Sequence, residues 1–373
     1  MVIPHRLSAI AGTDSEQPRK TMPEVKGYRR PEHGVFRFLP DAWVPYAELM
    51  RLDRQAGFWA YYWHCLIGLG FAINIPPFSG AMDLTTLALF AGYLGVWATI
   101  FRGICCTWND NLDQDLDRQV ARCRVRPIPR GAVSTAQAHV FTAAQIAVLA
   151  AILYPLGGSV SIHAVIDGVL LFIYPLLKRC TNYPQVYLGF ALSYAIFLVA
   201  AMAGKDPLAP LFDPSSSSSS SSSSDLSARL TTVAESPLAR SAGYLYFAGT
   251  LWSVIVDTIY AHQDYPDDLK AGIKGLAVRL GRKGTKPACY IAGAVQIFCL
   301  VKAGRLGGFG EAYYAISCGL TALALVWMIA VVDLENSDSC AWAFGNGNNY
   351  VGTAMTVGLM ADFVLKKYGY YSA

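Results

Sequence analysis

Charged residues are scarce in this chain, and their scarcity argues against an ordinary soluble globular protein. Asp, Glu, Lys and Arg make up 15% of its 373 residues, and hydrophobic residues make up 54%. A soluble domain carries about 25% charged residues. The apolar stretches also lack the alternation of polar and apolar residues that membrane β-strands show. The composition therefore predicts an all-α polytopic membrane protein, rather than a soluble helical protein or a β-barrel.

Zinc-binding and redox motifs are absent as well. The nine cysteines are scattered, and none forms a Cys-x-x-Cys pair or a Cys/His spacing typical of a zinc site. Six of them lie in or beside apolar stretches, so we interpret the cysteines as packing residues.

The first 44 residues form a polar N-terminal tail that lacks the apolar core of a secretory signal. A mitochondrial transit peptide should contain few acids, but Asp14, Glu16 and Glu24 interrupt the basic residues of this tail. The tail therefore favours the endoplasmic reticulum or another endomembrane, with the mitochondrial inner membrane as the alternative.

Apolar stretches recur along the whole chain, each about 17–25 residues long, which suits a helix across about 30 Å of hydrocarbon. Their centres lie near residues 67, 93, 145, 169, 195, 252, 295, 323 and 358. We predict about nine transmembrane helices in one domain, residues 45–368. A ten-serine run, residues 215–224, lies within a polar stretch, 204–242, that we predict to be a flexible loop.

Lys and Arg are concentrated in the connections that follow the second, fourth and sixth apolar stretches. The connections near 77–83 and 155–162 contain neither. Under the positive-inside rule, this asymmetry places the N-terminus and the basic connections on the cytosolic face.

Acidic residues gather where two apolar stretches end. The first group contains Asn109, Asp110, Asp113 and Asp117. At about 100° per residue, its three aspartates fall within about 60° of one another on a helix. Such carboxylates repel one another unless a cation lies between them, and their hard oxygen atoms suit Mg²⁺. The alternative is a helix cap followed by a solvated acidic turn.

The second group follows the stretch 243–261 and contains Asp264 and Asp268, which are one helical turn apart. Pro266 lies between them and should end or kink the helix. Both groups lead into a basic connection. Together they predict a site that holds a diphosphate through bridging Mg²⁺ ions.

These motifs resemble those of the UbiA-type intramembrane prenyltransferases. The family's Asn-Asp-x-x-Asp-x-x-x-Asp motif matches residues 109–117, and its Asp-x-x-x-Asp motif after Tyr-Ala-x-Gln matches 264–268. Val-x-Arg-x-x-x-Arg-Pro, Tyr-Pro-x-x-Lys-Arg and Gly-x-Lys occur in the family's order. The resemblance covers roughly 45–368 and implies a helical bundle around a central prenyl-diphosphate cavity.

The resemblance also implies roles for individual residues. The metal ligands, which would bind Mg²⁺ as the cofactor, would be Asn109, Asp110, Asp113, Asp117, Asp264 and Asp268. The diphosphate contacts would be Lys178, Arg126 and Lys274. Arg54 would bind either an acceptor carboxylate or a lipid headgroup, and Tyr174 would orient a carboxylate or shield an allylic cation. The main catalytic residues would be Asp110, Asp113, Asp264 and Tyr174.

The expected partners are an isoprenyl diphosphate donor, an aromatic acceptor and the lipid bilayer, with no nucleic acid. Residues 257–264 are most similar to the ubiquinone-type aromatic branch of the superfamily. The serine run and the tail favour a fungal enzyme of meroterpenoid biosynthesis, which attaches farnesyl or a similar chain to a polyketide phenol or pyrone. The alternative is the mitochondrial 4-hydroxybenzoate polyprenyltransferase of ubiquinone biosynthesis. Composition disfavours a soluble isoprenyl diphosphate synthase, and the paired acidic groups disfavour a transporter.

Overall fold

The computed structural model describes residues 28–76, 83–120, 122–212 and 226–370. Every regular element in these residues is helical. The structure thus confirms the all-α fold that the composition predicts.

Helices occupy each of the predicted apolar stretches. They are α2 (Ala56–Asn74), α3 (Leu84–Leu112), α5 (Thr135–Leu153), α6 (Gly158–Cys180), α7 (Pro184–Ser193) with α8 (Ala195–Met202), α11 (Pro237–Ala261), α13 (Leu276–Gly307), a π-helix (Tyr313–Leu320) with α14 (Thr321–Val331), and α16 (Asn348–Lys367). Within the described residues, six of these segments are long and apolar enough to cross a membrane, and α2, α11 and α16 are not among them. A count of nine spans therefore stays a prediction.

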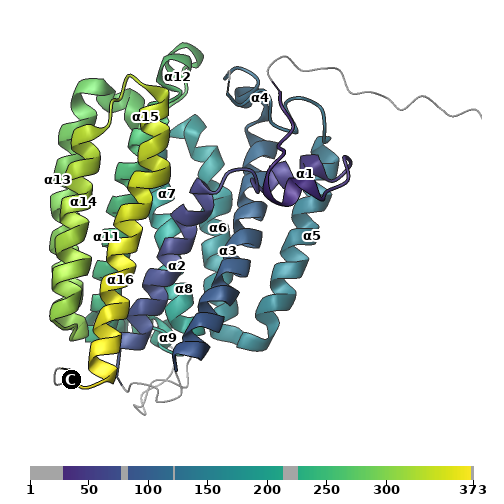
Figure 1. Cartoon of the computed structure of the whole chain (residues 1–373). Helices are drawn as coiled ribbons and strands as arrows, with labels where there is room; N and C mark the ends of the chain where they lie inside the picture. The colour runs from purple at the N-terminus through teal and green to yellow at the C-terminus, as the bar shows by residue number, and fades with distance from the viewer. Residues whose placement is uncertain (1–27, 77–82, 121, 213–225, 371–373) are drawn as a thin grey trace, which may run out of the picture.

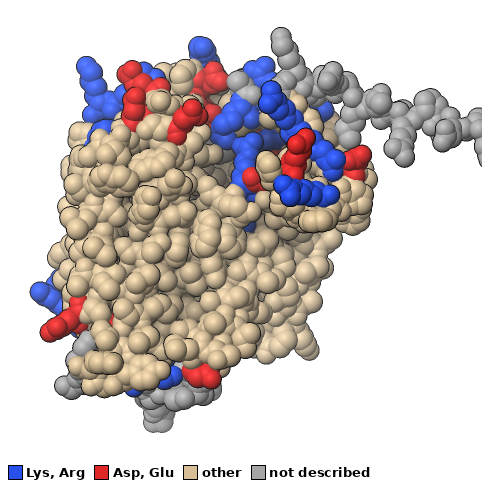
Figure 2. Space-filling view, in the orientation of Figure 1, with Lys and Arg blue, Asp and Glu red and all other residues tan. Residues whose placement is uncertain are grey.

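Shorter helices lie at the two ends of the bundle. Figure 1 shows α1 (Val44–Leu49), α4 (Gln114–Asp117), α12 (Tyr265–Ala271) and α15 (Ser337–Trp342) at one end, and α9 (Ala209–Phe212) with the C-terminus at the other. Charged side chains gather at the end that carries α4 and α12, whereas the visible sides of the bundle carry almost none (Figure 2). This distribution suits a protein whose sides face lipid and whose charged end faces water.

Small residues let the helices approach closely. Gly189 of α7 lies so near α11 that an added Cβ would be 2.6 Å from the carbonyl oxygen of Thr250. In the same way, Gly68 of α2 faces the backbone of Ile196 in α8. Close approach of backbones at small residues is the usual way in which helices associate in membranes.

Part of the stretch that we predicted as a flexible loop, 204–242, is helical. It contains α9, α10 (Leu226–Glu235) and the first turns of α11, while the serine run lies outside the described residues. Leu226, Leu230 and Val233 recur on one face of α10, and both leucines are exposed. An amphipathic helix of this kind suits a membrane surface. The composition of the stretch hid it, because the neighbouring serines dominate the average.

Of the predicted N-terminal tail, 1–44, the structure describes residues 28–44, and these pack against the domain. Phe36 and Val44 are buried, and the hydroxyl of Tyr28 donates a hydrogen bond to Glu48 at 3.0 Å. Residues 1–27 lie outside the described part of the chain.

Candidate active site

The first acidic group lies where α3 ends. α3 runs to Leu112, Asp113 is its C-cap residue with φ −90° and ψ 5°, and α4 then continues to Asp117. The spacing of the group predicted one continuous helix, but the structure divides the group between α3 and α4. Asp110, Asp113 and Asp117 are nevertheless all buried.

The second acidic group begins with Asp264, between α11 and α12, and continues into α12, which contains Asp268. α11 ends at Ala261, and Asp264 is the N-cap residue of α12. The helix is interrupted before Pro266. This proline lies in the first turn of α12, where a residue without an N–H group is tolerated. Figure 1 shows α12 and α4 at the same end of the bundle, so the two groups share one face of the protein.

A cavity of about 480 Å³ opens at this end. Its polar wall includes Arg51, Arg54, Asn109, Asp110, Arg122, Arg126, Asp257 and Gln263. Its apolar wall includes Ala60, Phe101, Leu171, Leu188, Leu192 and Val256, which come from five different helices or helix pairs. The cavity thus combines a charged wall with an apolar one.

Asp110 is the most buried acid in the cavity wall, and two arginines hold it. Nη2 of Arg51 donates to both carboxylate oxygens, at 2.6 and 2.7 Å, and Nη1 of Arg126 donates to Oδ1 at 3.1 Å. The Asp110 side chain is 1% exposed. A buried carboxylate needs such partners, because removing one of them costs about 3–5 kcal/mol.

Arg126 links two acids of the first group, Asp110 and Asp117. Its Nη1 also donates to Oδ2 of Asp117, at 2.7 Å. Burial by itself lowers the pKa of Arg126, but the charges of Asp110 and Asp117 more than offset this effect, so its pKa lies above its ordinary value. Arg126, which the sequence predicted as a diphosphate contact, is therefore a permanent cation in the cavity wall.

In the second acidic group, Arg122 pairs with Asp264. It donates through Nε and Nη2 to the two oxygens of Asp264, at 3.1 and 2.6 Å, and through Nη1 to the hydroxyl of Tyr260 at 3.4 Å. Burial lowers the pKa of Arg122, but hydrogen bonding to Asp264 raises it and contributes to a net shift above the ordinary value. The Val-x-Arg motif pointed to this residue, although we did not assign it a role from sequence.

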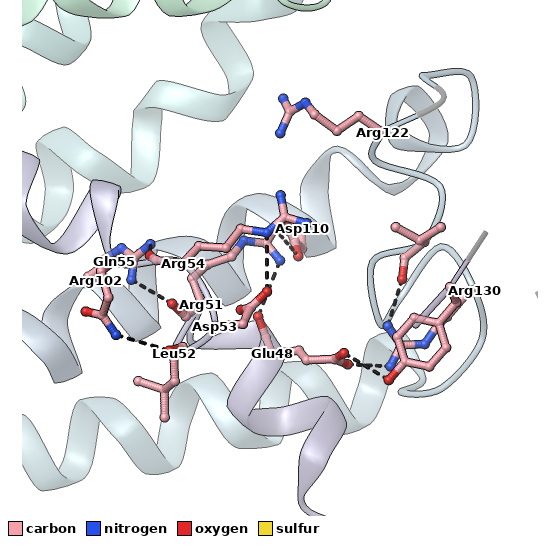
Figure 3. Close-up of polar contacts among 12 residues, drawn as sticks. Glu48, Arg51, Leu52, Asp53, Arg54, Gln55, Arg102, Asp110, Arg122 and Arg130 are labelled. Carbon is pink, nitrogen blue, oxygen red and sulfur yellow. Dashed lines mark hydrogen bonds and ion pairs between the residues drawn. The ribbon is translucent and has the colours of Figure 1, made fainter. Parts of the chain in front are cut away.

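The turn between α1 and α2 presents Arg51 to the site. Figure 3 shows Arg102 beside this turn, where it donates to the backbone oxygens of Arg51 at 2.9 Å and of Arg54 at 2.6 Å. Arg51 is the one non-glycine residue with a positive φ, 57°, among the described residues. That conformation disfavours a side chain with a Cβ, so contacts such as those of Arg102 must hold it.

The remaining predicted residues divide into three sets. Asn109, Tyr174 and Arg54 line the cavity, and Arg54 also pairs with Asp53 at 3.3 Å. Asp268 and the exposed Lys274 do not belong to the cavity wall formed by the described residues. Lys178 lies in α6, but its side chain is outside the described part of the structure.

The acidic groups suit a hard metal ion chemically, although no ready-made site is formed. In the described part of the chain, no group of three or more His, Cys, Asp or Glu residues is arranged to hold a metal. Guanidinium groups lie instead against the oxygens of Asp110 and Asp264. These oxygens thus attract cations, and carboxylate oxygens are the ligands that Mg²⁺ prefers.

The fold is that of a membrane-embedded helical bundle, and the charged and apolar walls of its cavity suit a ligand with an anionic head and an apolar tail. Comparison with known proteins narrows this class of protein. A model of the UbiA prenyltransferase family matches residues 61–350, and the chain belongs to this family. It is thus a membrane-bound prenyltransferase.

Individual relatives and a solved structure agree with this placement. The prenyltransferase ascA of Acremonium egyptiacum is 35% identical over 82% of this chain and 81% of its own length. The mitochondrial 4-hydroxybenzoate polyprenyltransferase of Saccharomyces cerevisiae is 34% identical over 89% of this chain and 80% of its own. A UbiA homologue from Archaeoglobus fulgidus bound to GPP and Mg²⁺ has the same fold, with a TM-score of 0.58 and 14% identity over 86% and 99% of the two chains.

Proposed function

We propose that this enzyme transfers a farnesyl group from farnesyl diphosphate to an aromatic polyketide acceptor, in a Mg²⁺-dependent reaction of meroterpenoid biosynthesis. The acceptor would be an orsellinate-type phenol or a pyrone. The observation that carries the proposal is the cavity itself. Its arginines and aspartates match a metal-bound diphosphate, and its apolar wall matches an isoprenyl chain.

The cations of the cavity wall would hold the diphosphate. Arg51, Arg122 and Arg126 line the cavity, and we assign Lys178 and Lys274 to the same role. Asn109, Asp110, Asp113, Asp117, Asp264 and Asp268 would hold the metal. When bound, Mg²⁺ would neutralise the charge that develops on the leaving diphosphate.

The reaction breaks the allylic C–O bond, and its electron pair leaves with the diphosphate. A ring carbon of the acceptor then attacks the allylic cation, and loss of the ring proton restores aromaticity. The apolar wall, with Phe101 and Leu188, keeps water from the cation. Tyr174 lies in the same wall, where its ring can shield the cation.

The acceptor would enter beside Arg54, which lines the cavity near its exposed rim and can pair with a carboxylate. An orsellinate-type acid presents such a group, and so does 4-hydroxybenzoate. The second compound defines the alternative function, a 4-hydroxybenzoate polyprenyltransferase of ubiquinone biosynthesis. The yeast relative that carries this name supports the alternative.

We place the enzyme in the endoplasmic reticulum or another endomembrane, with its charged end facing the cytosol. The basic connections and the clustered charges in Figure 2 support this orientation. The mitochondrial inner membrane is the compartment that the alternative function would require.

The test is a parallel comparison of the two acceptors. Microsomes that contain the protein are incubated with Mg²⁺, farnesyl diphosphate and either orsellinic acid or 4-hydroxybenzoate, and the products are analysed by mass spectrometry. We expect a Mg²⁺-dependent farnesyl adduct of orsellinic acid. A product from 4-hydroxybenzoate alone would assign the enzyme to quinone biosynthesis instead.

A further inference from the structure

Each acidic group has one carboxylate that carries an arginine on both of its oxygens. Arg51 contacts both oxygens of Asp110, at 2.6 and 2.7 Å, and Arg122 contacts both oxygens of Asp264, at 3.1 and 2.6 Å. These contacts join residues that are 59 and 142 positions apart in the sequence. We call Arg51 and Arg122 the blocking arginines.

A blocking arginine and a metal ion compete for the same atoms. Mg²⁺ binds oxygen at about 2.0–2.1 Å and demands near-octahedral geometry. A guanidinium that holds both oxygens of a carboxylate leaves that space filled and adds a positive charge to it. A metal ion that arrives alone must therefore displace the arginine and leave it without its counterion.

The two arginines have another anion within reach when the donor is present. Both line the cavity, so a diphosphate that enters it lies next to their guanidinium groups. Phosphate oxygens accept bidentate hydrogen bonds from arginine as readily as carboxylates do. Each arginine can thus exchange its carboxylate for the diphosphate and stay paired.

The backbone around Arg51 confines this exchange to the side chain. Arg102 donates hydrogen bonds to the carbonyl oxygens of Arg51 and Arg54 (Figure 3). These contacts anchor the backbone of the turn, so we expect the exchange to move the Arg51 side chain and not the turn. The Arg51 side chain is 12% exposed and points to the cavity from this fixed turn.

We propose that the blocking arginines make metal binding depend on the donor. Without donor they occupy Asp110 and Asp264 and oppose the metal. With donor they turn to the diphosphate, and the freed carboxylates bind the metal together with it. This inference rests on the proposed metal–diphosphate function.

The proposal predicts opposite effects of one substitution on two affinities. Each of Arg51→Gln and Arg122→Gln removes one guanidinium that competes with the metal, so the metal alone binds about tenfold more tightly or better. At Asp110 the hydrogen bond from Arg126, at 3.1 Å, remains in the Arg51 variant, so the gain should be clearest in Arg122→Gln. The same variants lose a diphosphate contact, so the donor binds about tenfold more weakly in the presence of metal. Substitution of a residue with a purely structural role would weaken the binding of the metal and of the donor alike.

The experiment measures Mn²⁺ binding to the purified protein in detergent by electron paramagnetic resonance, with and without the unreactive donor analogue farnesyl thiodiphosphate. Arg179→Gln is the matched control. Arg179 also holds both oxygens of an aspartate, Asp115, at 2.9 and 2.6 Å, but it does not belong to the cavity wall. We expect its metal affinity to equal that of the wild type.

Arg122 makes the test robust, because its side chain is 29% exposed and its replacement disturbs the core less than that of Arg51. The proposal holds if both variants gain affinity for Mn²⁺ alone and lose affinity for the analogue. It is overturned if the wild-type protein without analogue binds Mn²⁺ as tightly as Arg122→Gln does. If no protein binds Mn²⁺ even with the analogue, the metal-dependent function itself is wrong.

Discussion

At the scale of single residues, several buried acids of this structure are held by a specific hydrogen-bond donor. Tyr61 and Asp167 form such a pair inside the bundle, where the tyrosine hydroxyl donates to Oδ2 of Asp167 at 2.6 Å. Trp97 donates in turn to the same hydroxyl at 3.3 Å. Asp167 is fully buried, and its Oδ1 has no hydrogen-bond partner among the described residues. The hydrogen bond from Tyr61 is therefore the main polar contact that stabilises the Asp167 carboxyl group in the core.

Tyr61→Phe should destabilise the protein by about 1–3 kcal/mol, because it leaves a buried polar group unsatisfied. The measurement is thermal unfolding in detergent. Tyr93→Phe is the matched control, since Tyr93 loses only a 3.3 Å hydrogen bond to the backbone oxygen of Ile152. Equal unfolding midpoints for the two variants would contradict this account of Asp167.

Tyr28 adds a pH-dependent contribution outside the membrane. Burial and the neighbouring charge of Glu48 raise its pKa from 10.0 to about 12. Because the folded-state pKa is the higher one, this stabilisation is complete below about pH 10 and is lost as the pH rises through about 12.

Wild type should therefore unfold at a higher temperature than Tyr28→Phe near pH 8, and the difference should shrink as the pH approaches about 11. Thermal unfolding of both proteins at the two pH values checks this. A difference that grows with pH would contradict the assignment.

At the scale of helices, the crossing of α7 and α11 depends on Gly189. A methyl group there would lie 2.6 Å from the carbonyl oxygen of Thr250 and 3.2 Å from a methyl of Val254. Backbone atoms cannot move aside cheaply, so Gly189→Ala should destabilise the bundle by about 1–3 kcal/mol.

Gly243→Ala serves as its control, because a Cβ at Gly243 would meet nothing within 4 Å. That variant should be neutral or slightly stabilising, since alanine favours helix over glycine. Chemical or thermal unfolding in detergent compares the two. The packing account fails if Gly189→Ala is as stable as Gly243→Ala.

The helices and the acidic groups were predictable from the sequence because their signals are local. Apolar stretches of membrane-spanning length indicate helices, and Asp110 and Asp264 follow such stretches. The partners of these acids were not predictable. Arg51 and Arg122 meet them across 59 and 142 residues, and only the tertiary fold sets such distances.

Two further features escaped the sequence analysis for different reasons. Asp167 gave a usable signal, since an acid in an apolar stretch is expensive and usually has a partner, but we did not weigh it. The end of α3 before Asp113 gave no signal in the sequence, because helix geometry alone favoured one continuous helix through the acidic group.

At the scale of the whole molecule, one end carries the cavity and most of the charged side chains visible in Figure 2. Cys180 marks that end, since it follows Arg179, which pairs with Asp115 at 2.6 Å. Cys180 is also exposed, unlike the other cysteines, which are buried or half-buried.

If this end faces the cytosol, a membrane-impermeant maleimide should label Cys180 in sealed microsomes without detergent. The Cys180→Ser variant, treated in the same way, gives the background. Labelling that appears only after the membrane is permeabilised would place the cavity on the opposite face.

The central claim is that both acidic groups act together on a metal-bound diphosphate. Its most direct measurement is the rate of diphosphate release from farnesyl diphosphate, with acceptor and Mg²⁺, by wild type, Asp113→Ala and Asp264→Ala. The exposed acid Asp338 supplies the control variant, Asp338→Ala. We predict that each of the first two variants is folded and at least about a hundredfold slower, while the control equals wild type. Wild-type rates in either Asp113→Ala or Asp264→Ala would contradict the account.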